Sequence, residues 1–452
     1  MNSADTATAP TPSFSAKPAL PSRRRRLGIG DWIFAALVAA GLVVTLSRYG
    51  ASMDGYEIAI TLGAAAAMTW LGWSFKPLRV WLVLVALASL IGIASYGGDL
   101  ARADQAFFLK YLFASQSAIL WMCALFVLST LFYWIGLLGG ARGFAVTAAQ
   151  MGSWFLWAAV GMGLTGLMMR WYESHQMGPG IGHIPVSNLY EVFVLFCLIT
   201  SLFYLHYERR YATRSLGAFV MLVVTGATGF LLWYSFDRGA HEIQPLVPAL
   251  QSWWMKIHVP ANFIGYGTFS LAAMVAYAYL VQEQTRKGSS TAGLARLWMA
   301  GTALFLMFIA PMMMHGQPDA LRWTGYLVGC AALSAAIVAV RRPIAERLPA
   351  PDVLDDVMYK AIAVGFAFFT IATILGALWA AEAWGAYWQW DPKETWALIV
   401  WLNYAAWLHL RLVKGLRGTL AAYWALVGLL VTGFAFLGVN MFLSGLHSYG
   451  TL

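Results

Sequence analysis

The stretch Gln116–Leu138 reads QSAILWMCALFVLSTLFYWIGLL, and none of its 23 residues is Asp, Glu, Lys, Arg or His. A helix needs about 20 apolar residues to cross the ~30 Å hydrocarbon core of a bilayer. Comparable apolar runs recur along the chain, and together they predict thirteen spans: 32–48, 58–75, 79–96, 116–138, 152–170, 187–206, 215–235, 262–282, 294–314, 323–341, 357–381, 394–412 and 420–441. The sequence therefore predicts an all-α, polytopic integral membrane bundle of about thirteen transmembrane helices.

The composition excludes several other classes of protein. The 452 residues are 60% hydrophobic and only 11% charged, whereas soluble proteins carry roughly 25% charged residues. A soluble enzyme, a disordered chain and a disulfide scaffold are all excluded on this ground. Cys123, Cys197 and Cys330 lie within apolar runs and form no CxxC pair, so we expect buried thiols without redox chemistry. The spans hold almost no charged residues and the chain has no phosphate loop, which argues against an ion or solute transporter.

The basic residues predict the orientation in the membrane. If the N-terminus is cytoplasmic and the C-terminus external, 21 of the 29 Lys and Arg residues lie in inner segments. The net charge of +9 therefore reflects membrane topology and does not indicate a nucleic-acid partner. We expect a disordered basic tail over 1–30, which includes Arg23–Arg26 and precedes an uncleaved first span. N-terminal transmembrane helices follow over 31–100, and the main transmembrane domain covers 101–452.

An aromatic segment lies between the predicted spans 357–381 and 394–412, on the outer side. It reads WGAYWQWDPKETW from Trp384 to Trp396, with four Trp and one Tyr in thirteen residues. Single Trp residues commonly anchor helices at the membrane surface. So many flat indole rings in one short loop, together with Gly385, favour stacking on a large planar ligand. The run Asp391-Pro-Lys-Glu394 is also typical of a helix start, so Asp391 has either a structural or a ligand-related role.

Most histidines lie on the predicted outer side, in or beside external segments: His175, His183, His241, His258, His315 and His447. His206 and His409 lie near the cytoplasmic ends of their helices. A lone His usually makes an ordinary hydrogen bond, but several of them beside an aromatic loop favour ligation of a haem iron or another metal.

The aromatic segment resembles the tryptophan-rich WWD segment of the haem-handling proteins of cytochrome c maturation. More narrowly, the chain resembles the CcsA (ResC) family, the membrane subunits of System II cytochrome c synthases. Three further stretches carry this resemblance: IPVSNLYE at 184–191, SWWMKIHV at 252–259 and GVNMFLSGLHSYG at 438–450. It covers about residues 150–452, so 101–452 is expected to be a haem-handling domain. The first hundred residues carry no matching motif.

The resemblance implies that haem b lies at the outer face against the tryptophan-rich segment, in contact with Trp384, Gly385, Trp388, Trp390, Asp391 and Trp396. It also implies that His258 and His447 ligate the iron there, and that His409 binds haem in transit within the membrane. Fifteen residues separate Glu394 from His409, or roughly 22 Å of helix, so one haem cannot occupy both places. The external cations are candidates to meet the haem propionates: Arg170, Arg238, Lys256, Arg322 and Lys393.

The resemblance further implies a function in the cytoplasmic (inner) membrane. With a ResB/CcsB-type membrane partner, the chain is then expected to attach haem to the Cys thiols of a CxxCH motif in an exported apocytochrome c, which thiol-reducing proteins are expected to keep reduced. The chain contains no large external domain of the kind found in fused relatives, so we expect a synthase subunit that is active only with its partner. The alternative is a haem exporter or chaperone that hands haem on without ligation. No catalytic residue is predicted, and His175, His183, His206, His241 and His315 receive no role.

Overall fold

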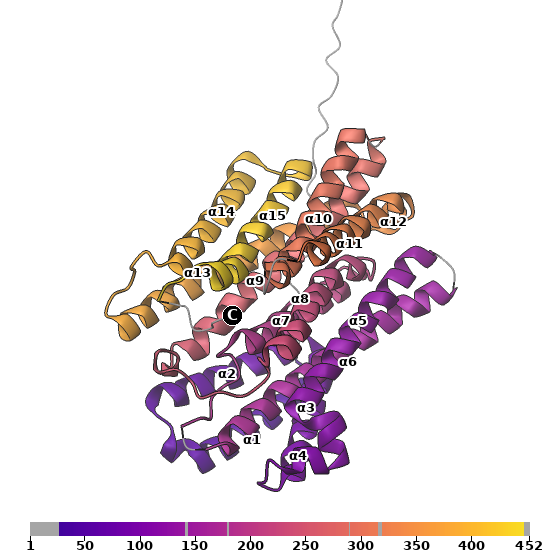
Figure 1. Cartoon of the computed structure of the whole chain (residues 1–452). Coiled ribbons are helices and arrows are strands. Elements are labelled where there is room, and N and C mark those ends of the chain that lie inside the picture. Colours follow the sequence, from indigo (N-terminus) through magenta and orange to yellow (C-terminus); the bar gives the residue numbers. More distant parts are fainter. Residues whose placement is uncertain (1–26, 141–142, 179, 289, 315–318, 447–452) are drawn as a thin grey trace, which may run out of the picture. The chain divides into compact units, whose positions relative to one another are not determined.

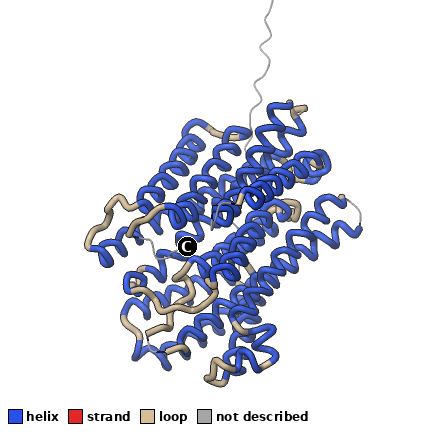
Figure 2. Tube along the Cα trace, viewed as in Figure 1, coloured by secondary structure: helices blue, strands red, loops and turns tan. Residues whose placement is uncertain are grey.

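The computed structural model describes residues 27–140, 143–178, 180–288, 290–314 and 319–446. Throughout these ranges the chain is built of helices and loops, with no strand (Figures 1 and 2). The chain divides into two compact units, residues 1–79 and residues 80–452. The description of the first unit begins at residue 27.

The first unit holds α1 (Ile29–Tyr49), the 3₁₀ turn η1 (Gly50–Ser52), α2 (Gly55–Ser74) and the first turn of α3 (Lys76–Tyr96). The rest of α3 opens the second unit, which continues with α4 (Arg102–Gln105), η2 (Leu109–Phe113), α5 (Ser115–Gly139), α6 (Gly143–Gln176), α7 (Leu189–Arg210), α8 (Gly217–Arg238), η3 (Pro248–Gln251), α9 (Met255–Arg286), α10 (Thr291–Met314), α11 (Ala320–Ala339), α12 (Arg341–Arg347), α13 (Pro351–Trp384), α14 (Pro392–Lys414), α15 (Gly418–Gly433), η4 (Phe434–Gly438) and α16 (Val439–Phe442).

Twelve helices in the described part of the chain are long and apolar enough to cross a membrane. They coincide with twelve of the thirteen predicted spans, and α15, η4 and α16 together form the last one. The remaining predicted span, 58–75, corresponds to α2, which forms a helix of 20 residues but is not among the twelve. The predicted all-α polytopic membrane bundle is confirmed, whereas the sides on which the two termini lie stay a prediction. The three cysteines are buried free thiols, as predicted.

A buried ion pair holds the first unit together. Asp31, near the start of α1, is 3% exposed and pairs with Arg79. The Arg79 guanidinium also donates to the carbonyl oxygens of Gly72, at 2.6 Å, and Gly30, at 3.1 Å. One side chain therefore ties the start of α1 to the end of α2. The guanidinium has five N–H donors in a fixed plane, which suits it to serve several acceptors at once.

Helix α9 is the centre of the second unit. In its most apolar stretch of 18 residues, 94% of the residues are buried. The helix packs against α7 and α8 on one side and α13 and α15 on the other (Figure 1). The close approach of α9 and α13 depends on Gly365. A Cβ atom at this position would lie 2.5 Å from Thr268 Oγ1 and 2.7 Å from the Phe269 ring. Small residues at helix crossings allow this contact, which is a common basis of helix association in membranes.

Several helix ends lie beyond the predicted spans, and two of them bear on the site. Helix α9 begins at Met255 instead of residue 262, and α13 continues to Trp384 instead of ending at 381. Hydropathy marks where a helix is apolar, whereas its hydrogen bonds continue past the apolar part. As a result, His258 lies in the first turns of a helix, Trp384 is the last residue of a helix, and the aromatic loop shortens to residues 385–391.

We predict that Gly365→Ala weakens the packing of α9 on α13. The added methyl group requires Thr268 and Phe269 to move, and overpacking of this kind typically costs about 1–3 kcal/mol of stability. The measurement is the thermal unfolding midpoint of the purified protein in detergent. Gly329→Ala in α11 is the control, because a Cβ atom there meets nothing within 4 Å. Equal midpoints for the two variants would contradict the role given to this crossing.

Candidate functional site

A cavity of about 560 Å³ lies in the second unit, where the ends of several helices meet. This volume lies in the range of ~300–1,000 Å³ that is typical of ligand pockets. Its lining comes from segments that are far apart in the sequence: 186–192, 234–250, 255–266, 369–379, 387–397 and 435–441. The aromatic loop, His258 and the 184–191 motif therefore share one cavity. The sequence indicates their common side but not that they meet.

His258 projects from α9 and is held against α13. Its Nδ1 lies 2.8 Å from the carbonyl oxygen of Ala372, which fixes Nδ1 as the protonated nitrogen. A Cβ atom at position 376 would lie 2.8 Å from His258 Cε1, so the ring needs the glycine there. The ring is also stacked beside Trp379, with centroids 6.2 Å apart. His258 lines the cavity, and no residue in the described ranges forms a hydrogen bond with Nε2, which keeps its lone pair for a ligand.

The aromatic loop places its rings in different surroundings. Tyr387 and Trp388 line the cavity, whereas Trp384 packs on Trp379 with ring centroids 4.8 Å apart. Trp390 is 69% exposed and meets Trp388 edge to face at 5.8 Å. Trp396 packs on Phe434 with centroids 4.3 Å apart. Of the aromatic residues in this segment, only Tyr387 and Trp388 line the cavity and can touch a ligand in it. The contacts with haem expected for Trp384, Trp390 and Trp396 stay predictions.

Left-handed backbone shapes this loop at both ends. Gly385 ends α13 with φ +79°, a conformation that glycine adopts without strain. Trp390 has φ +59°, which is rare for a residue with a large side chain and costs about 1–3 kcal/mol. The surrounding hydrogen bonds maintain this conformation: Thr395 Oγ1 donates to the Trp390 carbonyl at 3.2 Å. The turn directs the Trp390 ring away from the cavity lining, to which it does not belong.

Asp391 begins α14, as its sequence context predicts. It is the N-cap residue, Pro392 is the first helical residue, and Asp391 Oδ2 accepts from the Lys393 N–H at 3.0 Å. Glu394 completes the cap by accepting from the N–H groups of Asp391, at 3.2 Å, and Gln389, at 2.7 Å. The second Asp391 oxygen accepts from the N–H of Leu446 at 2.6 Å. One carboxylate therefore joins the aromatic loop to the C-terminal segment.

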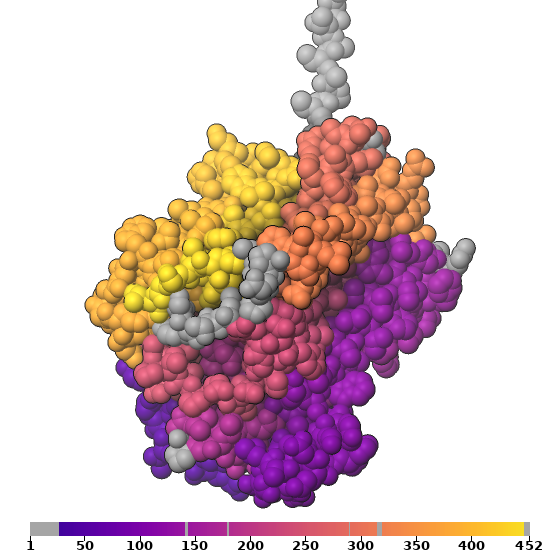
Figure 3. Space-filling model, in the orientation of Figure 1, coloured from indigo at the N-terminus to yellow at the C-terminus, as the bar shows by residue number. Residues whose placement is uncertain are grey.

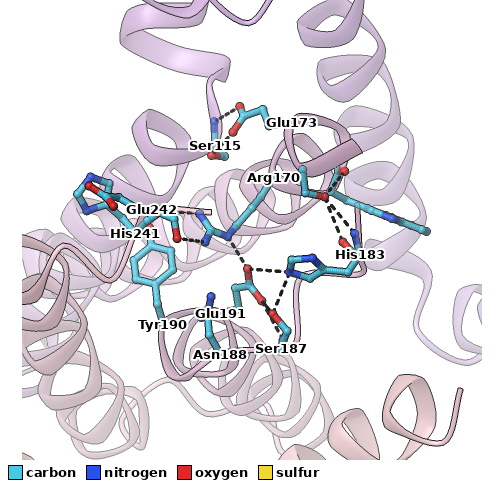
Figure 4. Close-up of polar contacts among 12 residues, drawn as sticks. Ser115, Arg170, Glu173, His183, Ser187, Asn188, Tyr190, Glu191, His241 and Glu242 are labelled. Atoms are coloured by element: carbon cyan, nitrogen blue, oxygen red, sulfur yellow. Dashed lines mark hydrogen bonds and ion pairs between the residues drawn. The ribbon is translucent and has the colours of Figure 1, made fainter. Parts of the chain in front are cut away.

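Arg170 lies in a buried polar network below the cavity wall (Figure 4). Its side chain is 2% exposed, and its Nε donates to Glu191 at 2.6 Å. The two terminal nitrogens donate to the carbonyl oxygens of His241, at 2.6 Å, and Glu242, at 3.2 Å. Arg170 does not line the cavity, and each of its three guanidinium nitrogens bonds Glu191 or a backbone carbonyl, so the structure does not place it to meet a propionate there. Among the other predicted cations, Arg238 and Lys393 line the cavity, and Lys256 and Arg322 do not.

The 184–191 motif builds the wall next to Arg170. Asn188 caps α7 by accepting from the Glu191 N–H at 2.9 Å. The Ser187 hydroxyl lies 2.8 Å from Glu191 Oε2 and 2.9 Å from His183 Nε2 (Figure 4). Sequence reasoning quoted this motif but missed Glu191. The available signal was an Arg at the end of one apolar span, Arg170, and a Glu near the start of the next, Glu191. Charged residues at such positions are usually paired, so the two could have been predicted to form an ion pair.

His409 lies far from the cavity on the same helix that Asp391 begins. It is exposed on α14, a peripheral helix whose apolar stretch is only 17% buried. Four other exposed residues share its face at spacings of three and four: Ile399, Leu402, Ala406 and Val413. Figure 3 shows the α13 to α15 region in orange and yellow at the left of the view. His447 and His315 lie outside the described residues.

The fold and the cavity define a multi-pass helical membrane protein with a cavity of ligand size in its main unit. Residues 186–447 match the Cytochrome C assembly protein family, and this range holds every element of the cavity. The chain belongs to this family, and its role lies in cytochrome c biogenesis, which involves haem.

Individual relatives agree with this family. The cytochrome c biogenesis protein CcsA of Microcystis aeruginosa is 37% identical over 291 residues, which cover 62% of this chain and 81% of that protein. Its namesake in Chlorella vulgaris is 34% identical over 339 residues, which cover 72% of this chain and 93% of that protein. The protein of the same name in a Synechocystis species is 36% identical over 288 residues, with 62% and 82% covered.

We predict that Asp391→Ala destabilises the aromatic loop. The variant loses both the N-cap bond of α14 and the bond to Leu446, and loss of an N-cap alone costs about 0.5–2 kcal/mol. Asp391→Asn keeps one acceptor oxygen, so its unfolding temperature should lie between those of Asp391→Ala and the parent chain. Thermal unfolding followed by tryptophan fluorescence measures the effect. If the Ala and Asn variants unfold at the parent temperature, Asp391 has no structural duty.

Proposed function

We propose that the chain binds haem b in the cavity, presents it at the outer face of the cytoplasmic membrane and, with a ResB/CcsB-type partner, promotes its covalent attachment to apocytochrome c. One observation carries this proposal. A histidine with its Nδ1 bonded to a backbone carbonyl turns toward a cavity of ligand size, in a chain whose family assembles cytochrome c.

The lining of the cavity suits haem, which is flat and apolar at its centre and anionic at its propionates. Trp388, Tyr387 and Phe436 supply aromatic surface, and Arg238 and Lys393 supply positive charge. His258 Nε2 supplies the nitrogen ligand, and the carbonyl of Ala372 holds the ring in the tautomer that leaves this nitrogen unprotonated. The loop that carries Trp388 is supported by the other predicted contact residues, which are Trp384, Gly385, Trp390, Asp391 and Trp396.

His447 is proposed as the second axial ligand. Its sequence neighbour Leu446, the last described residue, donates its N–H to Asp391 at 2.6 Å, beside the aromatic loop. His258 and His447 would hold the haem iron through imidazole nitrogens, and such a haem would be low-spin. The haem supplies the vinyl groups to which the cysteine thiols add, so the task of the chain is to bind, orient and shelter the ring.

His409 and its face of α14 are proposed as the transit site and the docking surface of the partner. Ile399, Leu402, Ala406, His409 and Val413 repeat at the 3–4 spacing by which one helix packs along another. A histidine within an apolar face is costly in lipid and gains from a partner that covers it. A ResB-type helix on this face would bury His409 and bring a second ligand to a haem bound there.

We predict that His258→Ala removes or alters the haem of the outer site. Loss of one nitrogen ligand should convert a low-spin visible spectrum to a high-spin one, or lower the haem content of the purified protein several-fold. His175→Ala is the matched control, because its Nδ1 also bonds a backbone carbonyl, that of Trp171 at 2.9 Å, but the residue does not line the cavity. An unchanged spectrum in His258→Ala and in His447→Ala would overturn the proposed outer site.

We predict that Leu402→Trp impairs partner docking without emptying the cavity. The bulky ring disrupts the packing of a helix along the exposed face of α14, so less ResB-type partner should copurify, and cytochrome output should fall about tenfold. Leu420→Trp is the control, because Leu420 is exposed on α15, outside this face. Reconstitution with partner and apocytochrome c tests the reaction itself. Covalent haem on the apocytochrome supports ligation, whereas transfer without a covalent bond would support the exporter or chaperone alternative.

A further inference from the structure

Two walls of the cavity are irregular backbone. One is the segment 184–188 before α7, and the other is the segment 239–247 after α8. Backbone carbonyls in such segments lack the N–H donors that a helix provides. A buried carbonyl without a donor costs free energy. The question is which groups satisfy these carbonyls and thereby fix the two walls.

Arg170 supplies the donors for the 239–247 wall. Its guanidinium bonds two consecutive carbonyls, those of His241 and Glu242, from within the bundle (Figure 4). The same wall is bonded once more from α8, because His241 Nδ1 contacts the Ser235 carbonyl. Ala240 and Glu242, on either side of His241, line the cavity.

Glu191 connects this guanidinium to the other wall. Its Oε1 accepts from Arg170, and its Oε2 accepts from both the backbone N–H and the hydroxyl of Ser187, each at 2.8 Å. Ser187 itself lines the cavity. The Glu191 side chain is fully buried, at 0% exposure. Arg170 and Glu191 therefore form one continuous link from Glu242, on one wall, to Ser187, on the other.

We propose that the Arg170–Glu191 pair is a positioning device that sets the separation of the two cavity walls and so tunes how tightly the cavity holds its ligand. The pair lies behind the cavity lining and does not touch the ligand. This inference rests on the proposed haem function of the cavity, and it assigns a role to the 184–191 motif that the proposed function leaves unexplained.

Arg170→Lys tests this role because it keeps the positive charge and changes the hydrogen-bonding geometry. An ammonium group can still pair with Glu191, but it is a point donor and lacks the planar fork that reaches two further carbonyls in fixed directions. The 239–247 wall should therefore loosen while the ion pair remains. We expect haem to bind about tenfold more weakly in a titration of the purified protein, with a broadened or shifted Soret band.

The first unit offers a matched control, Arg79→Lys. Arg79 also pairs with a buried carboxylate and also donates to two backbone carbonyls, but it lines no part of the cavity. If Arg170 is only a structural residue, the two Lys variants should differ in thermal stability alone and share the parent haem affinity and spectrum. That outcome would overturn the proposal.

Two further variants keep the result interpretable. Glu191→Gln keeps an acceptor for Arg170 or for Ser187 but not for both, so its haem affinity should also fall, and this variant tests the link if Arg170→Lys does not fold. His258→Ala separates the two levels of the argument. If His258→Ala changes the spectrum and neither Arg170→Lys nor Glu191→Gln changes the affinity, the positioning role fails while the haem site stands. If His258→Ala has no effect, the haem site itself fails.

Discussion

The close crossing of α9 and α13 is the contact on which the cavity depends. Gly365 lets the two helices approach until Thr268 and Phe269 fill the space that a side chain would need. The same approach, about two turns further along α13, brings His258 within hydrogen-bond distance of the Ala372 carbonyl. A wider crossing would leave the imidazole without its orienting partner. Helix packing in the membrane thus decides which nitrogen of His258 faces the cavity.

The walls of the cavity follow a second constraint, which is the need to pair buried polar groups. Inside the bundle, helices satisfy their own backbone, but the segments that end them do not. The chain meets this need with side chains that cap or bond the irregular backbone. Asp391 and Glu394 do so at the start of α14, and Arg170 and Glu191 do so at the other side of the cavity. Rigid loops result from these bonds, and a rigid wall can hold a flat ligand in one orientation.

The main unit separates two places where haem chemistry is proposed. The cavity lies at the N-terminal end of α14, and His409 lies near its C-terminal end, on an exposed face. Residues of the second unit line the cavity, whereas the side chain of His409 is exposed in the described part of the chain. The first place is therefore suited to hold and present a ligand, and the second is suited to share a ligand with another membrane protein.

The sequence by itself determined the fold class, because long uncharged runs have few alternatives to membrane helices, and it located the start of α14 from Asp391, Pro392 and Glu394. The motifs around His258 and Trp388 also marked the residues that line the cavity. Only the tertiary structure decided that these segments meet, that Trp390 turns away from the lining, and that Arg170 is bonded to Glu191 instead of facing a ligand. The physical reason is range: propensity and hydropathy act within a few residues, whereas a buried charge takes its partner from wherever packing brings one.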